Sequence, residues 1–169
     1  MDTRQRVLVV AGLLAVLAVV AILAVPPIQF VNPGPYENTS VTVVDENGTA
    51  LATVDVRVAD TTAKRRVGLR RTETLSDGEG MLFVHASDGE KPYIMPPSMS
   101  FPLDIVFVAP DGTIRAIRHA AVPADDTTLE YPGRGKYVLE VPRGYTNRTG
   151  IAAGDTVEIP AAYAEPAGG

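Results

Sequence analysis

The stretch 101–121, FPLDIVFVAPDGTIRAIRHAA, most limits what this chain can fold into. Its first half, Leu103 to Ala109, is an almost continuous apolar run with one carboxylate, Asp104, at its entrance. Residues 110–112 (PDG) then supply turn chemistry, because Pro presets φ and Gly accepts positive φ. Apolar residues return over 113–121. A run this apolar is typical of a strand buried on both faces, so the stretch predicts a hairpin at the centre of the domain.

Short strand patterns on both sides of this hairpin predict a β-dominated domain. We expect a hairpin over 41–59 that turns at the Asn-Gly pair 47–48, then a helix over 63–72 with its N-cap in 60–62. Residues 124–135 are polar and rich in turn formers, which indicates an exposed loop. Further apolar segments lie at 81–85, 93–95, 136–141 and 156–159, and a second short helix is expected to end at Gly150. The predicted fold class is α+β, a curled or barrel-like sheet with one main helix and a short second helix, preceded by a single transmembrane helix.

Residues Val7–Val25, VLVVAGLLAVLAVVAILAV, contain no polar or charged side chain. As a helix this run would extend about 28 Å, close to the ~30 Å hydrocarbon core of a bilayer. Arg4 and Arg6 precede it and 26–38 lacks Lys and Arg, so the N-terminus is predicted to be cytoplasmic. The alternative is a cleaved signal peptide, but its apolar core usually has about 7–15 residues. We therefore expect a single-pass protein of the cell membrane with its C-terminal domain outside.

Composition limits the partners of the exported part. The predicted organisation is a cytoplasmic N-terminus at 1–6, a transmembrane signal anchor at 7–25, a Pro-rich spacer at 26–39, one domain at 40–160 and a flexible tail at 161–169. The net charge of −5 argues against a nucleic-acid partner. The chain has no Cys, which excludes disulfides and thiolate metal sites. No cofactor is predicted, and the expected partners are the membrane, through Val7–Val25, and an unknown ligand or envelope component.

Five segments carry a family resemblance. In chain order they are VRVADTTAKRRVGL, GMLFV, FPLDIVFVAPDGTI, KYVLEVPRG and GIAAGDTV, and together the chain from 54 to 159 resembles the domain of unknown function 192 family, also called UPF0127. The resemblance implies a compact β-rich domain with one principal helix, often exported or membrane-anchored in bacteria and archaea. It implies no established activity, so no catalytic residue is carried over. The stretch 93–99, YIMPPSM, departs from the family pattern, because the usual basic and amide positions are replaced.

Two carboxylates stand in apolar strands. Asp104 is either a base or ligand with a perturbed pKa, or a carboxylate held by backbone N–H groups or by an Arg of the basic helix. We favour the second interpretation, because a buried charge must be paired to persist. Glu140 faces away from its neighbours Leu139 and Val141, which indicates either a second carboxylate near Asp104 or the solvated face of an edge strand. A close pair would suit a hydrolase.

The two histidines, His85 and His119, lie at or near strand ends. With Asp104 or Glu140 they would complete a metal site of two histidines and one carboxylate. Their spacing matches no familiar metal motif, so solvated or hydrogen-bonded histidines are favoured over a metal site.

Two surface features offer binding or modification sites. The basic helix carries Arg65, Arg66 and Arg70, which would bind a phosphate, a glycan carboxylate or a lipid headgroup, or which form a solvated face. The solvated face is the favoured interpretation. Asn-x-Ser/Thr triplets begin at Asn38, Asn47 and Asn147, and each is a candidate glycosylation site.

The leading hypothesis is a membrane-anchored, extracytoplasmic β-rich module that binds a ligand or an envelope component, and binding is favoured over catalysis. The first alternative is a hydrolase that acts on an envelope substrate with Asp104 and Glu140. The second alternative is a metal-binding module that uses His85 and His119.

Overall fold

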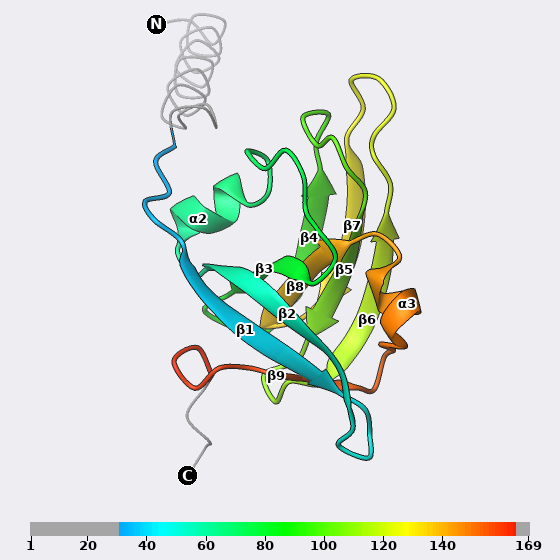
Figure 1. Cartoon of the computed structure of the whole chain (residues 1–169). Helices are drawn as coiled ribbons and strands as arrows, with labels where there is room; N and C mark the ends of the chain where they lie inside the picture. Colours follow the sequence, from blue (N-terminus) through cyan, green and yellow to red (C-terminus); the bar gives the residue numbers. More distant parts are fainter. Residues whose placement is uncertain (1–30, 165–169) are drawn as a thin grey trace, which may run out of the picture. The chain divides into compact units, whose positions relative to one another are not determined.

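The computed structural model describes residues 31–164, which fold around a curled, half-barrel sheet of seven strands and a second sheet of two (Figure 1). The strands are β1 Glu37–Val44, β2 Ala50–Ala59, β3 Glu79–Val84, β4 Glu90–Met95, β5 Leu103–Val108, β6 Ile114–Ala120, β7 Leu129–Arg134, β8 Tyr137–Pro142 and β9 Thr156–Glu158. The helices are α2 Thr62–Val67 and α3 Tyr145–Thr149. The large sheet has the order β6-β5-β8-β3-β2-β1-β9, and β4 pairs with β7. The predicted β-dominated domain with two short helices is therefore confirmed.

The hairpin predicted over 101–121 forms from β5 and β6, which pair antiparallel. All six residues of β5 are buried, and β5 lies between β6 and β8. The turn closes through the Ala109 N–H, which donates to the Thr113 carbonyl at 2.9 Å. Gly112 adopts a φ of +92°, and a Cβ there would come within 2.6 Å of the Val157 carbonyl oxygen, so this turn requires glycine.

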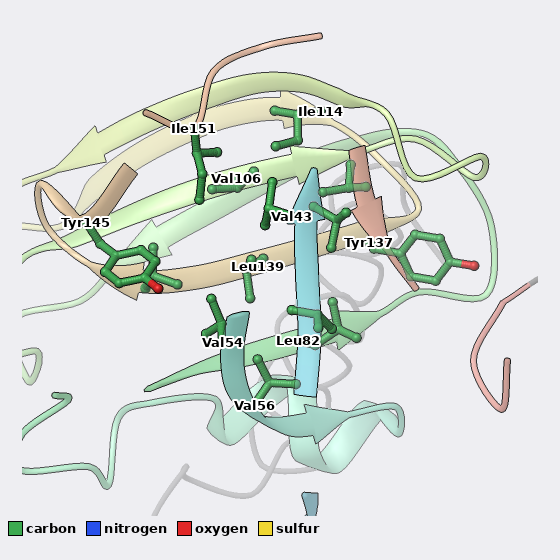
Figure 2. Packing of buried hydrophobic residues seen from close by; sticks show 14 of the residues in the cluster. Val43, Val54, Val56, Leu82, Val106, Ile114, Tyr137, Leu139, Tyr145 and Ile151 are labelled. Carbon is green, nitrogen blue, oxygen red and sulfur yellow. The ribbon is translucent and has the colours of Figure 1, made fainter. Parts of the chain in front are cut away.

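The large sheet buries side chains on both faces, which produces two cores. Successive residues of a strand point to opposite faces. Val106 of β5 therefore belongs to the first core, while Ile105 and Phe107 belong to the second. Figure 2 shows the first core, where Val43, Val54 and Leu139 converge from different strands. The second core is covered by aromatic and apolar side chains of β4 and β7.

Several predicted boundaries are corrected. The range 124–135 is not a loop throughout, because β7 forms within it and pairs with β4. Helix α2 ends at Val67, since Gly68 takes a φ of +51° and its N–H donates to the Lys64 carbonyl. Strand β1 begins at Glu37, inside the range predicted as spacer. The predicted tail is anchored at Tyr163, whose hydroxyl donates to Glu37 at 2.6 Å.

The predicted membrane anchor Val7–Val25 lies outside the described residues. Within residues 31–164, no helix combines the length and apolar character needed to cross a bilayer.

Gly133 of β7 lies directly against the Phe107 ring of β5. A Cβ at this position would stand 2.5 Å from ring atoms of Phe107, which is itself fully buried. We expect Gly133→Ala to destabilise the domain by about 2 kcal/mol, because overpacking a core forces neighbouring groups apart. Urea unfolding measures this loss. Glu130→Ala on the exposed side of β7 is the control, and equal effects of the two changes would contradict the prediction.

Candidate ligand-binding site

A cavity of about 240 Å³ opens between α2 with the turn that follows it, the end of β3, and β4 with the loop after it. Its walls are mainly apolar and include Val67, Leu69, Phe83, Pro92, Tyr93, Ile94, Met95, Pro96, Met99 and Leu103. Its polar groups are Arg65, Arg66, Arg70, His85 and Glu140. Apolar walls with a few convergent polar groups are the usual composition of a small-molecule site.

Glu140 projects into this cavity from the central strand β8. It stands opposite Met81 of β3 and Ile105 of β5, and only 6% of its surface is exposed. None of the hydrogen bonds found within 31–164 involves its carboxyl group, and the carboxyl oxygens remain accessible from the cavity, because no fully buried side-chain oxygen in this part of the chain lacks a partner. Burial raises the pKa of Glu140 to about 8, although the positive charge of Arg70 opposes this rise. Glu140 is therefore protonated at neutral pH. Of the two interpretations drawn from the sequence, the solvated face of an edge strand is wrong, because β8 lies between β5 and β3 and Glu140 is buried.

The three candidate anion-binding arginines all line the cavity, but they are differently engaged. Arg65 is tied to the fold, because its Nη1 donates to the Asp60 and Val84 carbonyls at 2.7 and 2.8 Å. Arg70 is half-buried, and within the described residues its guanidinium has no hydrogen bond or ion pair. Burial lowers the pKa of Arg70, and Glu140 partly restores it. The charge of each of these two groups thus shifts the pKa of the other, although no hydrogen bond or ion pair joins Arg70 to Glu140.

His85 and Tyr93 form a polar but neutral part of the cavity wall. His85 Nε2 lies 3.2 Å from the Tyr93 hydroxyl oxygen. Burial, with help from the charges of Lys91 and Arg65, lowers the pKa of His85 to about 4. Burial also raises the pKa of Tyr93 well above its usual value. Tyr93 packs edge-on against Phe83, with the two ring centroids 5.4 Å apart, which is a favourable arrangement for two aromatic rings.

A separate polar cluster surrounds Asp104 on the other side of the sheet. The Asp104 side chain is fully buried, and its carboxylate accepts from His119 Nδ1 at 2.7 Å. It also accepts from the Thr146 hydroxyl at 2.7 Å and the Thr146 N–H at 3.1 Å. Burial alone would raise the pKa of Asp104, but these hydrogen bonds outweigh it and hold the pKa below its usual value. Asp104 is thus a satisfied carboxylate, as favoured, although its side-chain partners are His119 and Thr146 and not an Arg of the helix.

The structure does not bring the two carboxylates together. Asp104 stands opposite Val141 in the pairing of β5 with β8, whereas Glu140 stands opposite Ile105. Residues directly opposite each other share a face, so Asp104 and Glu140 point to opposite faces of the sheet. The acid–base pair considered as an alternative is therefore not formed.

The two histidines are also separated. His85 lines the cavity with Glu140, whereas His119 contacts Asp104 and has 40% of its side chain exposed. Among residues 31–164, no group of three His, Asp or Glu side chains is arranged to hold a metal ion. The proposed site of two histidines and one carboxylate is not assembled in the described part of the chain.

The three candidate glycosylation sites are all exposed. Asn38 lies in β1 opposite Arg57, and not in a spacer as predicted. Asn47 occupies the turn after β1, where its N–H donates to Asp45, and Asn147 lies on α3.

Comparison with known protein families identifies the family to which the chain belongs. The DUF192 model, described as uncharacterized ACR, matches residues 42–159. The chain belongs to the DUF192 family. This match spans both cores, the cavity and the Asp104 cluster, so the expected family is confirmed. Within this DUF192 domain, the stretch 93–99 that departs from the family pattern forms one wall of the cavity.

Two solved structures share the fold. One is a candidate transcription regulator from Sinorhizobium meliloti 1021, with a TM-score of 0.65 and 29% identity over 75% of this chain and 97% of that chain. The other is a protein of unknown function from Novosphingobium aromaticivorans DSM 12444, with a TM-score of 0.63 and 34% identity over 72% of this chain and 85% of that chain. The comparison with curated proteins found no match.

Proposed function

We propose that this DUF192 domain is a small-molecule-binding module and that the cavity beside α2 is its binding site. Glu140 is the observation that carries the proposal. A carboxyl group removed from water costs stability unless it finds a hydrogen-bond partner. Glu140 is 6% exposed and has no such partner within 31–164, yet it faces a cavity that a ligand can enter. A bound molecule would supply the missing partner.

Binding without catalysis is favoured over hydrolysis. A hydrolase of the expected kind needs two carboxylates on either side of one scissile bond. Asp104 and Glu140 lie on opposite faces of the sheet, and Asp104 already accepts three hydrogen bonds. The net charge of −5 also argues against a DNA-binding role like the one that the name of the Sinorhizobium relative suggests.

The module is proposed to stand outside the cell on a membrane anchor. Val7–Val25 has the length and apolar character of a transmembrane helix, and basic residues precede it. An envelope-derived or imported small molecule would then be the ligand. Protease added to intact cells tests the placement, since it should remove the domain while leaving the cytoplasm untouched.

Methionine methyl groups provide a direct test of binding. Met95 and Met99 line the cavity, whereas Met81 is buried in the second core and lies outside the lining. With ¹³C-methyl methionine, those members of a library of small aromatic and aliphatic acids, amides and amines that bind should shift the Met95 and Met99 signals and leave Met81 in place. Signals are assigned with Met95→Leu and Met99→Leu. A library that leaves both cavity signals unmoved would contradict the proposed function.

A further inference from the structure

We propose that the cavity recognises a small organic carboxylate with an apolar body, and that Glu140 and Arg70 together bind its carboxylate. This inference rests on the proposed function and names the ligand class for the same site. It follows from the charge of the cavity, from its walls and from the two side chains that have no other partner there.

The cavity is cationic within an acidic protein. Arg65, Arg66 and Arg70 line it, and Glu140 is its single carboxyl group. Since Glu140 carries no charge at neutral pH, none of the described side chains that line the cavity is anionic. An anion entering the cavity meets an attractive field that strengthens as water is displaced. A cationic ligand would be repelled.

Arg70 and Glu140 offer complementary hydrogen bonds to one anion. The Arg70 guanidinium presents several N–H donors and has no partner among residues 31–164. A protonated carboxyl group presents one O–H donor, and hydrogen bonds from such a donor to an anion are short and strong. A ligand carboxylate between the two would satisfy both groups at once. Arg65 is less available, because it is committed to the Asp60 and Val84 carbonyls.

The walls and the size of the cavity define the rest of the ligand. Phe83, Tyr93, Met95 and Met99 present aromatic rings and flexible thioethers, which favour a flat or aliphatic apolar body. The volume of about 240 Å³ is below the range of about 300–1,000 Å³ found for drug-sized ligands. A carboxylate is favoured over a phosphate because a doubly charged group loses more on leaving water.

The pH dependence of carboxylate affinity tests whether Glu140 takes part in binding. The titratable and charged groups that share the cavity with Glu140 are Arg65, Arg66 and Arg70 near α2, His85 at the end of β3 and Tyr93 of β4. His85 is neutral above about pH 5, Tyr93 is neutral below pH 10, and arginines stay charged. Among these cavity groups, Glu140 is the one whose charge changes between pH 6 and pH 9.5. Carboxylate affinity should therefore be constant up to about pH 8 and fall about tenfold per pH unit above it.

Benzoate and its neutral isostere benzamide are the probes, titrated against the full chain in mild detergent and followed by the Met95 and Met99 methyl signals. We expect benzoate to bind at least tenfold more tightly than benzamide at pH 7. Arg70→Gln should remove this preference while leaving benzamide binding in place. Arg71→Gln, at the neighbouring exposed position, is the matched control and should keep the preference. Glu140→Gln should bind benzoate with no fall in affinity above pH 8.

The outcomes separate the inference from the proposed function. If benzamide shifts Met95 and Met99 as strongly as benzoate at equal concentration, the ligand class is wrong and the binding site stands. If inorganic phosphate alone binds as tightly as benzoate, the apolar carboxylate class is also wrong. If neither probe nor any library member moves these signals, both proposals fail. Retained benzamide binding by Arg70→Gln shows that the variant is folded.

Discussion

Replacing Glu140 with Gln is expected to stabilise the folded domain by about 4 kcal/mol at pH 7.5. In the unfolded chain a Glu titrates near ~4.3, whereas burial raises the pKa of Glu140 to about 8 in the folded state. Between these values the folded state holds a proton that the unfolded state has released. Wild-type stability must then fall as pH rises, by about 1.4 kcal/mol per unit. Gln carries no charge in the folded or the unfolded state, so the stability of the variant does not fall with pH for this reason.

The measurement is urea unfolding of wild type and Glu140→Gln at pH 5 and at pH 7.5. The free energies of unfolding of the two proteins should differ little at pH 5 and by about 4 kcal/mol at pH 7.5. Glu130→Gln on the exposed side of β7 is the control and should change neither the stability nor its pH dependence. A Glu140→Gln variant that follows the wild-type pH profile would show that Glu140 is ionised in the folded protein. A stabilising change at a binding site is also the usual sign of a residue kept for function.

Replacing Asp104 with Ala is expected to destabilise the folded domain. Its free energy of unfolding should fall by about 3–5 kcal/mol at pH 7. The side chain is fully buried and accepts from His119 and twice from Thr146. Its removal leaves the Thr146 hydroxyl and N–H without their acceptor at the start of α3. Asp104→Asn should lose less, because an amide oxygen can still accept from Thr146.

Thermal unfolding measures this loss, and Asp126→Asn in the exposed loop before β7 is the control. The pH dependence supplies a second readout. Hydrogen bonds hold the pKa of Asp104 below its usual value, so the part of its contribution that depends on its charge is present above about pH 4 and is lost as pH falls through the folded-state pKa. The difference in stability between wild type and Asp104→Ala should therefore narrow in strong acid. A variant as stable as wild type at pH 7 would contradict the role assigned to this cluster.

Local sequence patterns predicted the elements that depend on chain neighbours. The Asn-Gly pair 47–48 does form the turn after β1, and Gly150 ends α3 in a left-handed conformation. The apolar run from Leu103 does form a strand buried on both faces. In each case the conformation is dictated by side chains within a few residues, which a sequence displays directly.

The cavity could not be predicted in the same way. Strand β7 was missed because Pro132 and Gly133 are turn formers, and they become a strand only through pairing with β4 about forty residues earlier. Met95 and Met99 are buried in the second core, and their additional place in a cavity wall follows from how the chain after β4 packs near α2. The signal present in the sequence was Glu140 itself, a carboxylate between Leu139 and Val141.

The sequence by itself determined the apolar segment Val7–Val25, the family, the strand-rich composition and the alternation that turns Glu140 away from Leu139. Only the tertiary structure decided that β8 is central, that Glu140 is buried beside Arg70, and that Asp104 faces the opposite side with His119. Alternation within one strand determines which of its residues share a face of the sheet. It does not determine whether a residue of β5 and a residue of β8 lie on the same face. That relation depends on the register between strands brought together by long-range pairing, and the register determines which charges meet.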